Sequence, residues 1–270
     1  MMRELRERDR VEARVLGALR CMDATTLVPL TLPVAVAGPG ASFVRNRSGL
    51  YVLRDWTALA AHATAFEAPP AAPPVGEAPP LDLTLIEPSG QYLPRRVRLA
   101  LPRDPNPANA AAAGSLFRAI DVAMYPSPQA PVATNWTVLR VTAVEAASGD
   151  ALGGALLRVM ANGTVLARGL TDWRGEALVP VSGVPVTTWS DDPNAVIVSE
   201  IPASLEAIFD PAAGRRTPAA AIRTGEPPVA PPLVDPDAIE NARAGLPQAS
   251  RAVQLATDRS LTLSLSIALP

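Results

Sequence analysis

Short runs in which apolar and polar residues alternate recur along the chain, and they predict strands rather than long helices. The clearest block starts with an alternating strand at 155–159. The Asn162-Gly163 pair follows as a strong hairpin signal, since both residues tolerate the positive φ of a type I′ turn. A second turn, DWRG at 172–175, precedes another alternating strand at 176–181. This pattern is typical of a small antiparallel β-sandwich.

The same interpretation of the whole chain predicts a mainly β protein with two sandwich domains, long Pro-rich connections and extended terminal arms. A polar turn with Arg and Gly occurs in both halves, as NRSG at 46–49 and DWRG at 172–175, which favours two similar units. We expect a charged arm at residues 1–10 and a first sandwich at 11–103 with a Pro-rich insert at 68–80. A linker ribbon at 104–135 then leads to a second sandwich at 136–201, and a Pro-rich extension at 202–270 ends in a strand.

Composition restricts the core and the partners. Hydrophobic residues make up 48% of the chain but aromatic residues only 4%, so the core must be built mainly from Ala, Val and Leu. The 30 prolines and 17 glycines favour short strands with irregular connections. All 24 residues counted as Lys or Arg are Arg, and a GC-rich genome explains this bias. Phosphate recognition is the alternative explanation, but it would require a net basic patch. The net charge is −2, so a nucleic-acid partner is not expected.

Residues that could carry chemistry are scarce. Cys21 is the single cysteine, which excludes an intrachain disulfide and a cysteine zinc site, and we expect it to be a small buried hydrophobe. His62 is the single histidine, with no second metal-ligand residue near it in the sequence. Ser48 and Ser89 lie in turns and not in a G-x-S-x-G motif. We therefore expect no catalytic residue and no cofactor, and hence a protein that is not an enzyme.

Two acidic groups are candidate metal ligands. Asp191-Asp192 and Asp235-Pro236-Asp237 offer paired carboxylates, but neither has the alternating oxygen ligands and the bend glycine of a calcium loop. We expect solvated loop acids and no metal site.

The N-terminus, MMRELRERDRVEAR, is highly charged where a signal peptide would have an apolar segment. No run of eighteen apolar residues predicts a membrane span. These features favour a protein that folds in the cytoplasm and is assembled into a particle that lysis could release.

Protein contacts are the most specific functional hypothesis. The C-terminal LTLSLSIAL alternates without a break and can pair within its own sheet or add to the sheet of a neighbour. We therefore take its apolar positions as partner-binding candidates: Leu261, Leu263, Leu265 and Ile267.

Aromatic and basic side chains supply the other candidates. Trp173 could cover one end of the sandwich or contact a partner, and either Trp173 or Trp189 could bind a carbohydrate. Arg45 and Arg47 are candidates because Arg is enriched at protein contacts. The RR pair at 95–96 could also contact a partner, although such pairs are usually solvated.

The stretch DALGGALLRV…GTVLARGLTDWRGEALVPV resembles carboxypeptidase-regulatory-like and transthyretin-like Ig sandwiches. The run LFRAIDVAMYPSPQAPVATNWTVLRV, together with ARGLTDWRGEALVPVSGVPVTTW and NRSGLYVLRDW, resembles accessory proteins of contractile injection systems and related phage-tail-like particles. The resemblance covers residues 11–201. It implies Ig-like sandwiches and a structural part of such a particle, in its baseplate or cap, that joins other protein subunits. A transthyretin-like module that binds carbohydrate or peptide is the main alternative, and cargo of the particle is a third.

Overall fold

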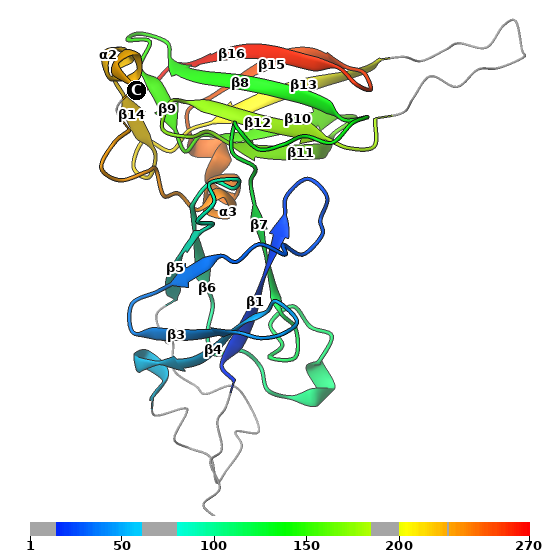
Figure 1. Cartoon of the computed structure of the whole chain (residues 1–270), viewed down its shortest axis with the longest axis vertical. Coiled ribbons are helices and arrows are strands. Elements are labelled where there is room, and N and C mark those ends of the chain that lie inside the picture. The colour runs from blue at the N-terminus through cyan, green and yellow to red at the C-terminus, as the bar shows by residue number, and fades with distance from the viewer. Residues whose placement is uncertain (1–14, 61–79, 185–199, 226) are drawn as a thin grey trace, which may run out of the picture.

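Two β-lobes stacked along the long axis make up the molecule, as the computed structural model shows (Figure 1). The structure describes residues 15–60, 80–184, 200–225 and 227–270. Its regular elements are predominantly strands, which confirms the predicted mainly β fold class. His62, Trp189 and Asp191-Asp192 lie outside the described residues.

The first lobe consists of two sheets, one with strand order β3-β4-β1-β7 and one with order β2-β5-β6. Alternation explains how they pack: Leu81, Leu83 and Leu85 are buried against the other sheet, while Asp82 between them is exposed. The strands of this lobe are β1 Gly17–Asp23, β2 Ala35–Ala37, β3 Ala41–Arg45, β4 Tyr51–Trp56, β5 Leu81–Ile86, β6 Arg95–Leu99 and β7 Ile120–Met124.

Strand β7 lies within residues 104–135, which we expected to be a linker ribbon. It pairs in parallel with β1, from Leu19 opposite Ile120 to Asp23 opposite Met124. Val122 and Met124 are buried in the core of the first lobe. The alternation in these five residues is too short to be distinguished from the Ala-rich and Pro-rich sequence on either side, so only the pairing with β1 identifies the strand.

The second lobe is a larger sandwich. One sheet has the order β11-β10-β13-β15, and the other has the order β12-β8-β9-β14 with β16 on the free side of β8. The Asn162-Gly163 turn joins β10 to β11 with φ values of 50° and 75°, as the sequence predicted. The strands are β8 Thr137–Glu145, β9 Ala151–Gly153, β10 Leu156–Ala161, β11 Thr164–Leu170, β12 Glu176–Val181, β13 Ile201–Ile208, β14 Arg215–Thr217, β15 Gln248–Leu255 and β16 Ser260–Ile267.

Residues 202–270, expected to be an extension outside the second sandwich, contribute strands to both of its sheets. β13 pairs with β10, β15 pairs with β13, and β16 pairs in parallel with β8. These partners are distant in sequence, so local alternation could not place the strands in a particular domain. Leu265 and Ile267 are consequently buried in the core of their own lobe.

The two arginine–glycine turns are not equivalent in the structure. NRSG joins β3 to β4 within one sheet, whereas DWRG carries the chain from β11 in one sheet to β12 in the other. Short helical segments complete the fold: α2 Ala219–Thr224, α3 Pro236–Ala242 and the 3₁₀ turns η1 Thr57–Leu59, η2 Pro107–Asn109 and η3 Arg243–Gly245.

Candidate functional site at the junction of the lobes

The two lobes share a small apolar core where they meet. Tyr125 follows β7 of the first lobe, and its ring is buried against residues that belong to the second lobe. The backbone crosses the same boundary, since the Arg96 N–H donates to the Val234 carbonyl at 2.7 Å. The buried members of this core are Tyr125, Leu156, Leu170, Ile208, Val234 and Ile239.

Helix α3 presents its N-terminus to the first lobe for local sequence reasons. Asp235 is the N-cap residue, and its carboxylate accepts hydrogen bonds from the N–H groups of Asp237 and Ala238. Pro236 occupies the first turn, where its missing N–H costs nothing. Asp235 and Asp237, expected to be solvated acids, therefore begin a helix that lies against β6.

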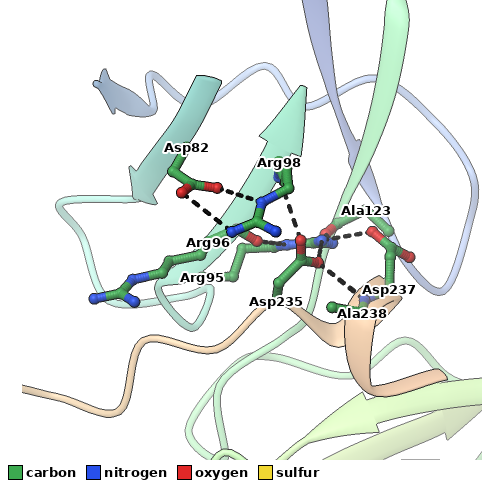
Figure 2. Close-up of polar contacts among 8 residues, drawn as sticks. All are labelled: Asp82, Arg95, Arg96, Arg98, Ala123, Asp235, Asp237 and Ala238. Carbon is green, nitrogen blue, oxygen red and sulfur yellow. Dashed lines mark hydrogen bonds and ion pairs between the residues drawn. The ribbon is translucent and has the colours of Figure 1, made fainter. Parts of the chain in front are cut away.

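Arg95 joins this helix to the first lobe. Its guanidinium donates to Asp237 at 2.6 Å and to Asp235 at 3.3 Å, and its Nη1 donates to the Ala123 carbonyl of β7 at 2.7 Å. Figure 2 shows the two aspartates pointing at the guanidinium from the start of α3. The ring centroid of Tyr125 lies 5.9 Å from the guanidinium carbon.

The Arg95 side chain is 0% exposed, which corrects for this residue the expectation that the RR pair is solvated, whereas Arg96 is exposed as expected. A buried charge of this kind is tolerated only when ionic partners and hydrogen bonds replace the lost water. Here two carboxylates and a carbonyl do so, and the Nε atom donates to the Arg96 carbonyl at 3.0 Å. Alternation along β6 was the available signal, because Arg95 falls in register with the buried Val97 and Leu99.

A charged cavity of about 420 Å³ lies beside this cluster and is lined by Arg96, Arg98, Asp82, Asp210 and Asp235, among others. Arg98 donates to Asp82 at 2.8 Å, and this hydrogen bond lowers the pKa of the Asp82 carboxyl. Within the described ranges, no group of three or more His, Cys, Asp or Glu residues could hold a metal ion.

A second cavity, of about 370 Å³, opens between the lobes on the side of the DWRG turn. Trp173 forms part of its wall, and the guanidinium of Arg174 lies 5.8 Å from the tryptophan ring centroid. Asp172 holds this turn by accepting from the N–H groups of Arg174 at 2.8 Å and Glu176 at 3.0 Å. The rest of the wall is mainly apolar or proline: Tyr92, Leu93, Pro94, Pro128, Leu170, Pro227, Pro231 and Pro232.

Ser127 gives this cavity a polar feature. The residue is 3% exposed, and its Oγ atom has no hydrogen-bond partner among the described residues.

The partner-binding candidates chosen from the sequence do not come together. Arg45 and Arg47 are exposed at the β3–β4 turn of the first lobe, where Arg45 donates to the Thr31 carbonyl at 3.1 Å. Trp173 is half-buried at the junction cavity. Leu261 and Leu263 are half-buried on β16, which lies at the far end of the second lobe in Figure 1.

Fold and site together define a two-lobed, mainly β protein with a buried ionic junction. No protein-family model matches the chain, and no curated protein matches it. Among solved structures it is similar to "The Bacillus anthracis TIE protein", with 10% identity and a TM-score of 0.27 over 94% of this chain. The chain spans about a third of that structure, covering 34% of its length. Among the described residues, no helix is both long and apolar enough to cross a membrane.

Proposed function

We propose that this protein is a non-enzymatic structural subunit of a contractile, phage-tail-like injection particle, and that it joins other subunits in the baseplate or cap. The resemblance of residues 11–201 gives the proposal its direction, and the Arg95 junction is the observation that carries it. A subunit that transmits force between neighbours needs its ends held in a fixed relation. Lobes linked by a small polar interface move relative to one another by default. A shared apolar core and ion pairs made by a fully buried arginine oppose that motion.

The surface of the first lobe supports a role in protein contacts. Leu27 is 72% exposed and has a φ of +57°, a left-handed conformation that is unfavourable for a leucine. Its N–H donates to the Asp23 carbonyl, and the Asp23 side chain accepts from the N–H groups of Thr25 and Thr26. The loop therefore holds an apolar side chain outward at an energetic cost, which is characteristic of residues that bind something.

Affinity purification of the tagged full-length chain from its native bacterium tests this proposal, with negative-stain microscopy of the eluate. We expect particles with sheath and tube proteins, and the position of the tag distinguishes baseplate, cap and lumenal cargo. Recovery of the chain without any tail protein would overturn the proposal. Deletion of residues 250–270 is not a suitable test, because it removes β16 and nearly all of β15 from the second sandwich.

The cavity at Trp173 favours a second candidate function, a module that binds carbohydrate or peptide. A mainly apolar cavity with an aromatic side chain in its wall is the kind of site that such ligands use. Titration of the wild-type chain and of the Trp173→Phe variant with oligosaccharide and peptide panels tests it. A fluorescence change present only in the wild type supports this function, and equal responses from both proteins exclude Trp173 as the reporter of a site.

A further inference from the structure

Strand β16 forms an edge of the second lobe that lacks the usual features that prevent edge-to-edge pairing. Its eight residues, SLTLSLSI, include no charge and no proline. Proteins normally protect long edge strands with charged side chains, prolines or bulges, because an open edge pairs with other chains. Every other edge strand among the described residues is three residues long or carries a charge: β2, β3 (Arg45), β6 (Arg98), β7 (Asp121), β11 (Arg168), β12 (Glu176), β14 and β15 (Arg251).

The register shows which backbone groups are open. The Arg259 carbonyl accepts from Val138 N–H at 2.8 Å, and the Ile267 carbonyl accepts from Ala146 N–H at 2.9 Å. The pairing of β16 with β8 is continuous between these two bonds. Since backbone groups alternate between the two edges of a strand, the odd-numbered residues face β8. The even-numbered residues direct their N–H and C=O groups outward: Ser260, Thr262, Ser264 and Ser266.

These outward groups have almost no partners within the described part of the chain. β16 pairs only with β8 there, and the one bond to its outer edge comes from Arg251 of β15, whose Nη1 donates to the Ser264 carbonyl at 3.4 Å. That distance is at the long end for a hydrogen bond. Figure 1 shows β16 along the outermost edge of the second lobe.

We propose that the outer edge of β16 accepts an extended strand from a neighbouring, different subunit of the particle, and this inference rests on the proposed function. Main-chain hydrogen bonds to the even-numbered residues would supply affinity. Apolar side chains of the incoming strand would cover the half-buried Leu261 and Leu263. A carboxylate near the middle of that strand would meet Arg251.

Arg251 also argues against a second copy of this chain as the occupant. Two copies of β16 paired antiparallel along their full length would bring their midpoints together, close to Ser264. The exposed Arg251 side chains beside the two strands would then face each other. Like charges in such a position are destabilising, whereas a partner carboxylate is attracted.

Ser264→Pro tests the proposal in the full-length tagged chain. The Ser264 N–H faces outward, so proline blocks the edge without removing a hydrogen bond to β8. Ser264→Ala is the matched control, since it keeps the N–H. We expect the alanine variant to co-purify with particles like the wild type, and the proline variant to fall by about tenfold or more. Urea unfolding checks that both variants are folded, and Thr262→Lys provides a second block of the edge that keeps every N–H.

The outcomes separate the two proposals. If the wild-type chain is absent from the particles, the proposed function is overturned, and this inference with it. Folded Ser264→Pro and Thr262→Lys proteins that enter particles at the wild-type level overturn the inference alone. A dimer of the free wild-type chain in sedimentation that Ser264→Pro abolishes would identify a second copy as the occupant and contradict the assignment to a different subunit.

Discussion

At the residue scale, the side chain with the largest structural consequence is Arg95. It donates to Asp235, Asp237 and the Ala123 carbonyl, so its removal takes away the charged contacts between β6, β7 and the start of α3. The polar RR dipeptide did not suggest this role, because sequence alone does not show that a helix more than a hundred residues away supplies two carboxylates.

We predict that Arg95→Ala lowers the free energy of unfolding by about 1.5–3 kcal/mol, the usual contribution of hydrogen bonds to a charged group, because water can replace part of the contact at Asp237, which is 56% exposed. Arg98→Ala is the control, because Arg98 forms an exposed pair with Asp82 and should change stability little. Chemical denaturation followed by circular dichroism measures both. Equal, small losses in the two variants would contradict the structural importance given to the junction.

Leu27 allows stability and binding to be separated. Leu27→Asn places a residue that tolerates positive φ at this position and removes the exposed side chain. We predict a gain in stability of up to about 1 kcal/mol together with weaker co-purification with particles. A variant that co-purifies like the wild type would show that the leucine has no role in assembly.

Cys21 gives a prediction about pH. The thiol is buried, as expected from the sequence, and burial raises its pKa from 9.0 to about 11, although the positive charges of Arg95 and Arg45 act in the opposite direction. Since only the thiolate reacts, alkylation of the folded chain at pH 8 should be about a hundredfold slower than that of the unfolded chain. The rate should still be rising with pH at pH 10. Mass spectrometry of iodoacetamide-treated samples measures it, and a plateau below pH 9 would be inconsistent with this environment.

At the element scale, the DWRG turn connects the two sheets of the second lobe and forms one wall of the Trp173 cavity. Gly175 has a φ of +71°, and a Cβ atom there would lie 2.4 Å from the Ala143 carbonyl oxygen. Gly163 in the hairpin turn has a similar φ of +75°, but a Cβ atom there would meet nothing within 4 Å. The two glycines therefore distinguish backbone strain from steric overlap.

We predict that Gly163→Ala costs about 1 kcal/mol, which is the strain of a left-handed alanine alone. Gly175→Ala should cost an additional ~1–3 kcal/mol because backbone must move to admit the methyl group. Urea unfolding of the two variants measures the difference. Similar losses would mean that the DWRG turn relaxes at little cost.

Elements with strong local signals could be predicted from the sequence. The Asn162-Gly163 hairpin and the strand after DWRG both form as expected, because turn chemistry and alternation are properties of adjacent residues. Their long-range pairing could not be predicted. Parallel partners such as β1 with β7 and β8 with β16 depend on contacts between distant segments. The alternation in LTLSLSIAL predicted a strand and left open whether it pairs within its own sheet, as it does.

At the scale of the whole molecule, the junction was the feature least accessible from sequence. Its residues come from β6, β7 and α3, and no local pattern indicates that these distant segments meet. Trp173, a candidate from the sequence, lies in the wall of a cavity that prolines from the 227–232 segment complete, and sequence could not show that these segments meet. The joined lobes, the buried arginine and the open β16 edge are the three features on which the proposed role as a joining subunit rests.

The most direct test of this account is quantitative mass spectrometry across a density gradient of particles from the native bacterium. The account predicts that the chain peaks with the sheath and tube proteins at a constant ratio to them. A chain found only in the light, soluble fractions, while sheath and tube sediment together, would contradict it.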